Sequence, residues 1–201
     1  MEKTLTPEES LQIIQKSISN SRKNIREGSF YYLLWGWVLI LASLANYFLI
    51  RRLIRLERYD DIMFSSLLAW GVFIMAALIL QFIIKSRRNR QERVVTHLDR
   101  YLTIIWIAAG LLMVLMVFLS LKLGAYPTPF ILGVTAMATA VSGLMVRFHP
   151  LVIGAVIFLM AAVVSSYLKG TDQLLVFAVA MVCGYLIPGY SIRTSRNGID
   201  V

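Results

Sequence analysis

The chain has 201 residues, of which 58% are hydrophobic and 15% are charged, and its formal net charge is +9. A water-soluble domain carries roughly a quarter of charged residues, so this composition excludes an ordinary soluble protein. It is typical of a protein that lies in a membrane.

Long apolar runs alternate with short polar segments along the chain. A run of about 20 residues matches a hydrocarbon core about 30 Å thick, at about 1.5 Å per helical residue. The sequence predicts six such spans, at residues 29–50, 62–84, 101–121, 128–146, 150–168 and 173–190. Transmembrane strands would instead alternate apolar and polar residues. The predicted fold class is all-α, a polytopic membrane helical bundle with six transmembrane helices and an N-terminal amphipathic cytosolic helix.

The N-terminal helix is expected over residues 1–28, before the transmembrane domain at 29–190 and a short cytosolic tail at 191–201. Thr6, Pro7 and Glu9 fit its cap, first position and capping box. An apolar stripe recurs at helical spacing and consists of Leu11, Ile14, Ile18 and Ile25. Gly28 is expected to end or hinge the helix. Two interpretations stay open: the stripe rests on lipid headgroups or on the cytosolic loop, or it docks a protein partner or a second copy of the chain.

Basic residues predict the orientation. The larger share of the 20 Lys and Arg residues falls on the side that holds both ends of the chain, which favours cytoplasmic termini. The segment 51–61, RRLIRLERYDD, weakens this asymmetry and is predicted to extend the first or second span along the interface. Anionic lipid headgroups account for the positive charge, so no nucleic-acid partner is needed.

Aromatic side chains follow the basic end of the N-terminal segment. The predicted interfacial anchors are Tyr31, Tyr32, Trp35 and Trp37. Trp35 and Trp37 are two residues apart, so they point to roughly opposite sides of a helix. One is expected at the headgroups and the other against neighbouring helices.

Small residues at packing distance along the last three spans predict that these spans form the tight core. They are Gly133, Ala136, Ala140, Gly143, Ala161, Ser165, Ala180 and Gly184. A short recurring pattern around Gly36, Gly71, Gly133 and Gly154 raises the hypothesis of a three-hairpin repeat architecture. If the repeat is real, each of these glycines marks a place where neighbouring backbones approach closely.

Hydroxyl side chains share one side of the fourth span and recur in the fifth. A polar path is one hypothesis for them, and hydrogen bonds to their own helix carbonyls or across a helix interface are the alternative. The residues are Thr135, Thr139, Ser142, Ser165 and Ser166.

Two short turns carry further hypotheses. In MVRFHPLV, Arg147 is expected to stabilise the end of the fourth helix, with Pro150 starting the fifth. The alternative is that Arg147 and His149 contact an anion or a lipid headgroup. In CGYLIPGYSIR, Pro188 and its neighbouring glycine predict a helix stop, with a hinge or an exposed backbone as the alternative.

Motifs for chemistry are missing from the sequence. No charged residue falls in the middle of a predicted span, which disfavours ion-coupled transport. No metal-ligand spacing, phosphate loop or nucleophile motif occurs, so neither a metal, another cofactor nor an enzymatic activity is expected. Cys183 is interpreted as a small packing residue.

The segments ESLQIIQKSISNSRKNIREGSFYYLLWGW, RFHPLVIGA and GYLIPGYSIR resemble a family of small, uncharacterised bacterial membrane proteins with six spans. The resemblance covers nearly the whole chain. It implies a location in the bacterial inner (cytoplasmic) membrane, and it supplies no catalytic residues.

Two classes of function follow. In the first, the protein is a non-enzymatic scaffold or signalling component, whose cytosolic docking surface combines the apolar stripe with the basic loop KSRRNRQERVVTHLDR. In the second, it is an oligomeric passive channel or facilitator for a small solute, lined by the hydroxyls of the fourth span. The expected partners are the lipid bilayer and a cytosolic protein or a second copy of the chain.

Overall fold

A computed structural model describes the backbone of residues 7–88 and 97–194, and the side chains of residues 30–87 and 100–191. Thr6, the expected helix cap, and most of the predicted tail 191–201 lie outside these ranges. The described chain is helical, with short turns between the helices. The elements are α1 (Pro7–Arg55), α2 (Asp61–Arg88), α3 (His97–Lys122), α4 (Thr128–Val146), α5 (His149–Tyr167), α6 (Asp172–Met181), a π-helical segment η1 (Val182–Leu186) and α7 (Ile187–Thr194).

Six stretches of helix are long and apolar enough to cross a membrane. They are Phe30–Arg55, Asp61–Arg87, Arg100–Lys122, Thr128–Val146, His149–Tyr167 and Asp172–Ser191. A helix satisfies its own backbone hydrogen bonds, which is what the hydrocarbon core demands. The prediction of six spans is confirmed, and the protein is a multi-pass membrane protein.

The first helix is longer than expected. The prediction that Gly28 ends or hinges it is wrong, because α1 runs without a break from Pro7 to Arg55 over 49 residues. One glycine inside a helix costs only about 1 kcal/mol, which is too little to interrupt a long helix. At its other end α1 includes residues 51–55 of the arginine-rich segment, so this part extends the first span, as one of the two alternatives predicted.

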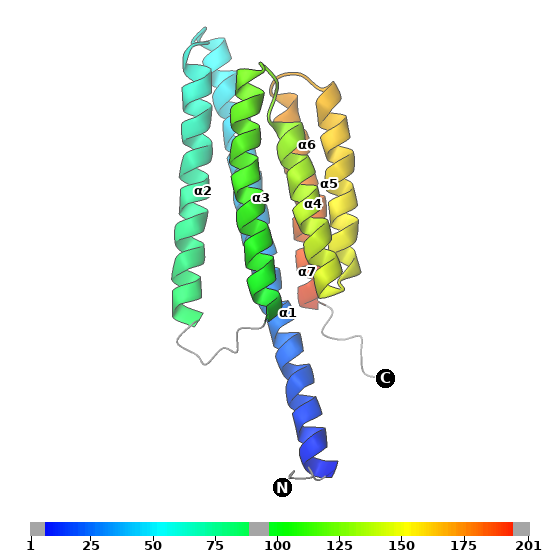
Figure 1. The fold of residues 1–201 in the computed structure, drawn as a ribbon. Helices are drawn as coiled ribbons and strands as arrows, with labels where there is room; N and C mark the ends of the chain where they lie inside the picture. The colour runs from blue at the N-terminus through cyan, green and yellow to red at the C-terminus, as the bar shows by residue number, and fades with distance from the viewer. Residues whose placement is uncertain (1–6, 89–96, 195–201) are drawn as a thin grey trace.

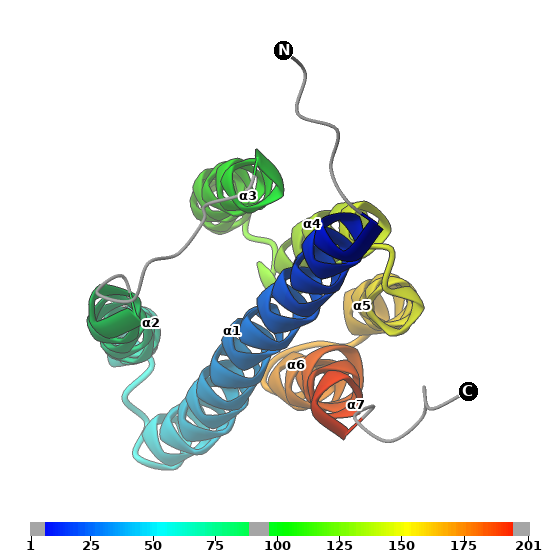
Figure 2. The same ribbon diagram turned by 90° about the horizontal axis from the view of Figure 1, so that it is seen from below.

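The helices lie side by side and α1 crosses the others obliquely (Figures 1 and 2). It packs against α2 on one side and against α6, η1 and α7 on the other. The most extensive contact joins α4 and α5, and α3 packs mainly against α4. The start of α1 and the end of α7 lie at the same end of the molecule, and the segment of α1 before Phe30 projects beyond the other helices (Figure 1).

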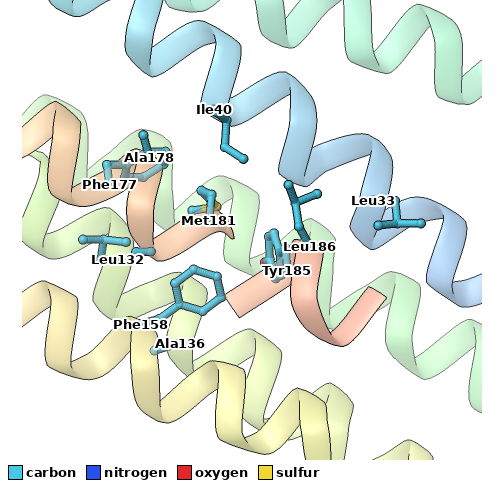
Figure 3. Close-up of a cluster of buried hydrophobic side chains, with 11 residues drawn as sticks. Leu33, Ile40, Leu132, Ala136, Phe158, Phe177, Ala178, Met181, Tyr185 and Leu186 are labelled. Carbon is cyan, nitrogen blue, oxygen red and sulfur yellow. The ribbon is translucent and has the colours of Figure 1, made fainter. Parts of the chain in front are cut away.

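The hydrophobic core lies between α1, α4, α5, α6 and η1 (Figure 3). Its members are Leu33, Ile40, Leu132, Ala136, Phe158, Phe177, Ala178, Ala180, Met181, Tyr185 and Leu186. The last three spans do form the tight core, as predicted, and α1 joins them. On α2 and α3, in contrast, large apolar side chains such as Phe82 and Leu111 are mostly exposed and suited to contact lipid.

Only two of the four glycines in the recurring pattern mark close approaches. A methyl group on Gly36 would sit 2.9 Å from the Leu186 side chain, and one on Gly154 would sit 2.5 Å from the carbonyl oxygen of Gly184. Gly71 and Gly133 have nothing within 4 Å of that position, so the hypothesis is wrong for them. Both lie on helix faces that no neighbouring helix covers closely.

Candidate functional site

The most unusual backbone in the protein lies late in the sixth span. There the amide of Ile187 donates to the carbonyl of Val182, five residues earlier, which widens one helical turn into η1. Pro188 explains the wide turn, because its ring would collide with the carbonyl four residues earlier in a regular α-helix. The predicted stop at Pro188 is wrong: the π turn absorbs the proline and the helix continues as α7. Single π turns occur frequently at functional sites.

Four aromatic rings from four different elements meet at this wide turn. Tyr185 of η1 is only 2% exposed and contacts the other three rings; Figure 3 shows it beside Phe158. Its ring centroid is 4.9 Å from that of Phe158 on α5, 5.7 Å from that of Tyr32 on α1 and 6.4 Å from that of Trp106 on α3. We call these four residues the aromatic cluster. It joins the π turn to three other helices.

Hydroxyl groups of α4 complete the polar side of the aromatic cluster. Thr139 Oγ1 lies 3.2 Å from the Tyr185 hydroxyl, within hydrogen-bonding distance. The Tyr32 side chain lies beside those of Ser142 and Trp106. Ser142 Oγ donates to the carbonyl of Ala138 in its own helix. The Tyr185 phenol therefore has a hydroxyl partner on α4.

Two glycines allow α5 and η1 to come together beside the aromatic cluster. The carbonyl oxygen of Gly184 faces the Cα of Gly154, which permits a weak Cα–H···O contact between the helices. A side chain on Gly184 would overlap the ring of Phe158. The carbonyl that the proline leaves without an α-helical partner is therefore packed against α5 rather than exposed to a ligand.

The predicted polar path divides into separate local hydrogen bonds. Four hydroxyls donate to carbonyls of their own helix: Thr135 to Ile131, Ser142 to Ala138, Ser165 to Ala162 and Ser166 to Val163. Ser166 is also exposed on the outside of α5. Only Thr139 and Ser142 reach the side chains of other helices, at the aromatic cluster. This arrangement matches the structural alternative stated for the stripe.

Arg147 lies in the turn between α4 and α5, His149 is the first residue of α5, and both are exposed. Arg147 is the C-terminal cap of α4, in the left-handed conformation with φ 55°, and its amide donates to Leu144. The amide of Phe148 donates to Gly143, which completes the capping pattern typical of helix ends. Pro150 lies in the first turn of α5, as predicted. The turn therefore has a backbone role, and the headgroup contact stays a prediction.

The side chains of the four expected interfacial anchors have different surroundings. Tyr32 points into the aromatic cluster, and the indole of Trp35 donates to Gln81 Oε1 of α2 at 2.9 Å. Trp37 is 48% exposed and its indole lies 3.4 Å from the Tyr190 hydroxyl, while Tyr31 is half-buried beside Phe30. Trp35 and Trp37 thus face different surroundings.

The expected docking stripe belongs to α1, but its side chains lie outside the described part of the structure. The backbone is helical at Leu11, Ile14, Ile18 and Ile25. The four residues therefore recur along one helix, as the prediction of a stripe requires.

Several residues of interest were not predicted from the sequence. Tyr185, Trp106 and Phe158 looked like ordinary residues of apolar runs, and the sequence carries no signal that their rings meet. Asn46 and Gln173 were also missed, and both are buried amides. An amide within an apolar run is a signal that a search for charged residues alone overlooks.

Cys183 is a half-buried free thiol on η1. Among the described residues, no three His, Cys, Asp or Glu side chains form a group that could hold a metal ion.

Comparison with protein-family models, with curated proteins and with solved structures found no match for this chain. The resemblance to a bacterial six-span family therefore stays a prediction.

Proposed function

We propose that the protein is a non-enzymatic membrane scaffold or signalling component, which presents the segment of α1 before Phe30 as a docking element. One observation carries the proposal: a single helix extends from Pro7 through the first membrane span to Arg55. At about 1.5 Å per residue the segment before Phe30 is a rod about 35 Å long. Anchoring alone does not require so long an extension.

The docking surface of the proposal combines two features on one side of the membrane. The first is the apolar stripe of Leu11, Ile14, Ile18 and Ile25, which makes this segment amphipathic. The second is the basic connection between α2 and α3, since α2 ends and α3 begins at the end of the molecule from which α1 projects (Figure 1). A cytosolic protein with an apolar groove and an acidic rim fits both features.

The location of the protein in this proposal is the bacterial inner membrane, with both termini in the cytoplasm. The excess of Lys and Arg on the side of the termini supports this orientation. Anionic headgroups then surround the base of the projecting segment and favour the basic residues there.

The hydrogen bonds of the fourth span favour the scaffold over the passive channel. A solute path needs hydroxyls that are free to replace water around the solute. Thr135, Ser142 and Ser165 instead donate to carbonyls of their own helices and are buried. The interior around them is filled by the core side chains of Figure 3.

The proposal is tested by purifying the tagged protein from its own membranes after mild crosslinking and recording its complexes by native mass spectrometry. Replacing Leu11, Ile14 and Ile18 with Asp is expected to release a stoichiometric partner. A matched variant with Gln12, Gln15 and Ser19 replaced by Asp adds the same charge to the polar side and is expected to retain it. A wild-type protein without any protein partner, or equal loss from both variants, would contradict the proposal.

A further inference from the structure

Two buried amide side chains lie near the end of the molecule opposite the start of α1. Asn46 on α1 is 1% exposed and Gln173 on α6 is 2% exposed. Neither Asn46 Oδ1 nor Gln173 Oε1 accepts a hydrogen bond from any group that the structure describes. A buried acceptor without a donor is costly, and such groups in proteins nearly always have a protein or water partner.

The other end of each amide has a hydrogen-bond partner, and at Gln173 this partner fixes the orientation. Asn46 Nδ2 donates to Ser66 Oγ on α2 at 2.9 Å, and Gln173 Nε2 donates to the carbonyl of Leu168 at 2.7 Å. Turning the Gln173 amide over would place two acceptor oxygens against each other. Turning over Asn46 would exchange a free acceptor for a free donor. At Gln173, therefore, the unsatisfied atom is an oxygen.

Helix geometry places Asn46 and Gln173 at one level along the bundle. The rings of Trp70 on α2 and Phe177 on α6 are in edge-to-face contact, with centroids 5.6 Å apart. Ser66 and Gln173 each lie one helical turn before these rings, and α2 and α6 begin at the same end of the molecule (Figure 1). Because Asn46 bonds to Ser66, both amides lie just beyond the ring pair.

A third contact fixes α1 at this level. Ser43, one turn before Asn46, donates to the carbonyl of Leu174 at 2.6 Å. Hydrogen bonds thus join α1 to α2 and α1 to α6 at the level of Asn46 and Gln173. We call Ser43, Asn46, Ser66 and Gln173 the amide layer.

The hydrogen-bonding groups of the amide layer determine which kind of ligand it can bind. The free atom of Gln173 is a neutral acceptor, so the ligand must donate a hydrogen bond to it. The acidic residue beside Gln173 is Asp172, which is exposed and lies 3.8 Å from Arg51, so its charge is directed to the surface. A cation would need several oxygens, preferably with a carboxylate among them. Water needs two to four polar partners, and one molecule can donate to two oxygens.

We propose that the amide layer binds a water molecule, which donates to Asn46 Oδ1 and Gln173 Oε1 above the Trp70 and Phe177 rings. Asn46 lies inside the first candidate span and Gln173 at the start of the sixth, and both side chains are buried. The bound water joins α1 and α6 as a permanent part of the fold. It is independent of the docking proposed for the projecting segment.

Hydroxyl-radical footprinting of the protein in lipid nanodiscs tests the site, because radicals formed from a bound water oxidise the side chains beside it. The readout is the oxidation rate of Trp70, and the control is Trp106, a second half-buried indole. We expect Trp70 to react severalfold faster than Trp106. The near-isosteric Gln173→Met is expected to lower the rate at Trp70 severalfold and to leave Trp106 unchanged.

Three results would overturn the proposal. The first is equal oxidation rates at Trp70 and Trp106, and the second is an oxidation rate at Trp70 that Gln173→Met leaves unchanged. The third is an oxidation rate at Trp70 that falls when sodium replaces choline in the buffer, which would indicate a bound cation instead of water. If Gln173→Met fails to fold, Asn46→Leu replaces it. A high-resolution map of the wild-type protein decides without any variant: a density peak within hydrogen-bonding distance of both oxygens supports the water, and its absence where surface waters are visible contradicts it.

Discussion

The carbonyl oxygen of Gly184 faces the Cα of Gly154, so that a methyl group on Gly154 would sit only 2.5 Å from the oxygen. The contact joins α5 to η1, beside the aromatic cluster. Only glycine at position 154 permits this approach, because the atom opposite is backbone and cannot rotate away.

The first prediction concerns this contact. Gly154→Ala is expected to lower the free energy of unfolding by about 1–3 kcal/mol, the usual cost of overpacking. Titration with sodium dodecyl sulfate in mixed micelles measures the change. Gly133→Ala is the matched control, since nothing lies within 4 Å of its added methyl group, and it is expected to be neutral or stabilising by up to about 1 kcal/mol. Equal losses for both variants would contradict the packing described here.

The second prediction concerns the hydroxyl pair of Thr139 and Tyr185. Tyr185→Phe keeps the ring and removes the hydrogen bond, and Thr139→Val removes the partner. A double-mutant cycle is expected to give a coupling energy of about 0.6 kcal/mol, and not more than about 1.7 kcal/mol, which is the range for hydrogen bonds between membrane helices. Strict additivity of the two losses would mean that the pair does not interact.

The third prediction compares two tryptophans on one helix. Trp35→Phe removes the indole that donates to Gln81 and links α1 to α2, and it is expected to destabilise the protein by about 1 kcal/mol. Trp37→Phe makes the same chemical change at an exposed position and is expected to cost less than about 0.5 kcal/mol. Unfolding in mixed micelles measures both, and a larger loss at Trp37 would reverse their assigned roles.

The fourth prediction concerns the left-handed backbone of Arg147. Arg147→Gly is expected to be more stable than Arg147→Ala by about 1 kcal/mol, because glycine adopts a positive φ without a steric penalty. Both variants lose the same guanidinium, so the comparison isolates the backbone. Thermal unfolding followed by circular dichroism provides the measurement. Two variants of equal stability would show that the turn relaxes when the side chain is lost.

The six spans were predictable because each depends on a local property, the length of an apolar run. The aromatic cluster was not, since it depends on which helices meet: Tyr32 and Tyr185 are separated by most of the chain. Small residues correctly predicted the close packing at Gly154, but the same reasoning was wrong for Gly71 and Gly133, because spacing does not reveal which face of a helix meets a neighbour. Pro188 was recognised as a disturbance, while its resolution by a π turn required knowledge of the packing around Phe158.

The unbroken course of α1 has a mechanical consequence. A helix rotates as one body, so a twist of the first span inside the membrane turns the projecting segment through the same angle. Inserting one alanine after Gly28 is expected to rotate the docking stripe by about 100° relative to the span, whereas inserting seven changes its direction by only about 20°. The partner would then be retained after the seven-residue insertion and lost after the single one. This result would show that the rotation of the first span sets the direction in which the docking stripe faces outside the membrane.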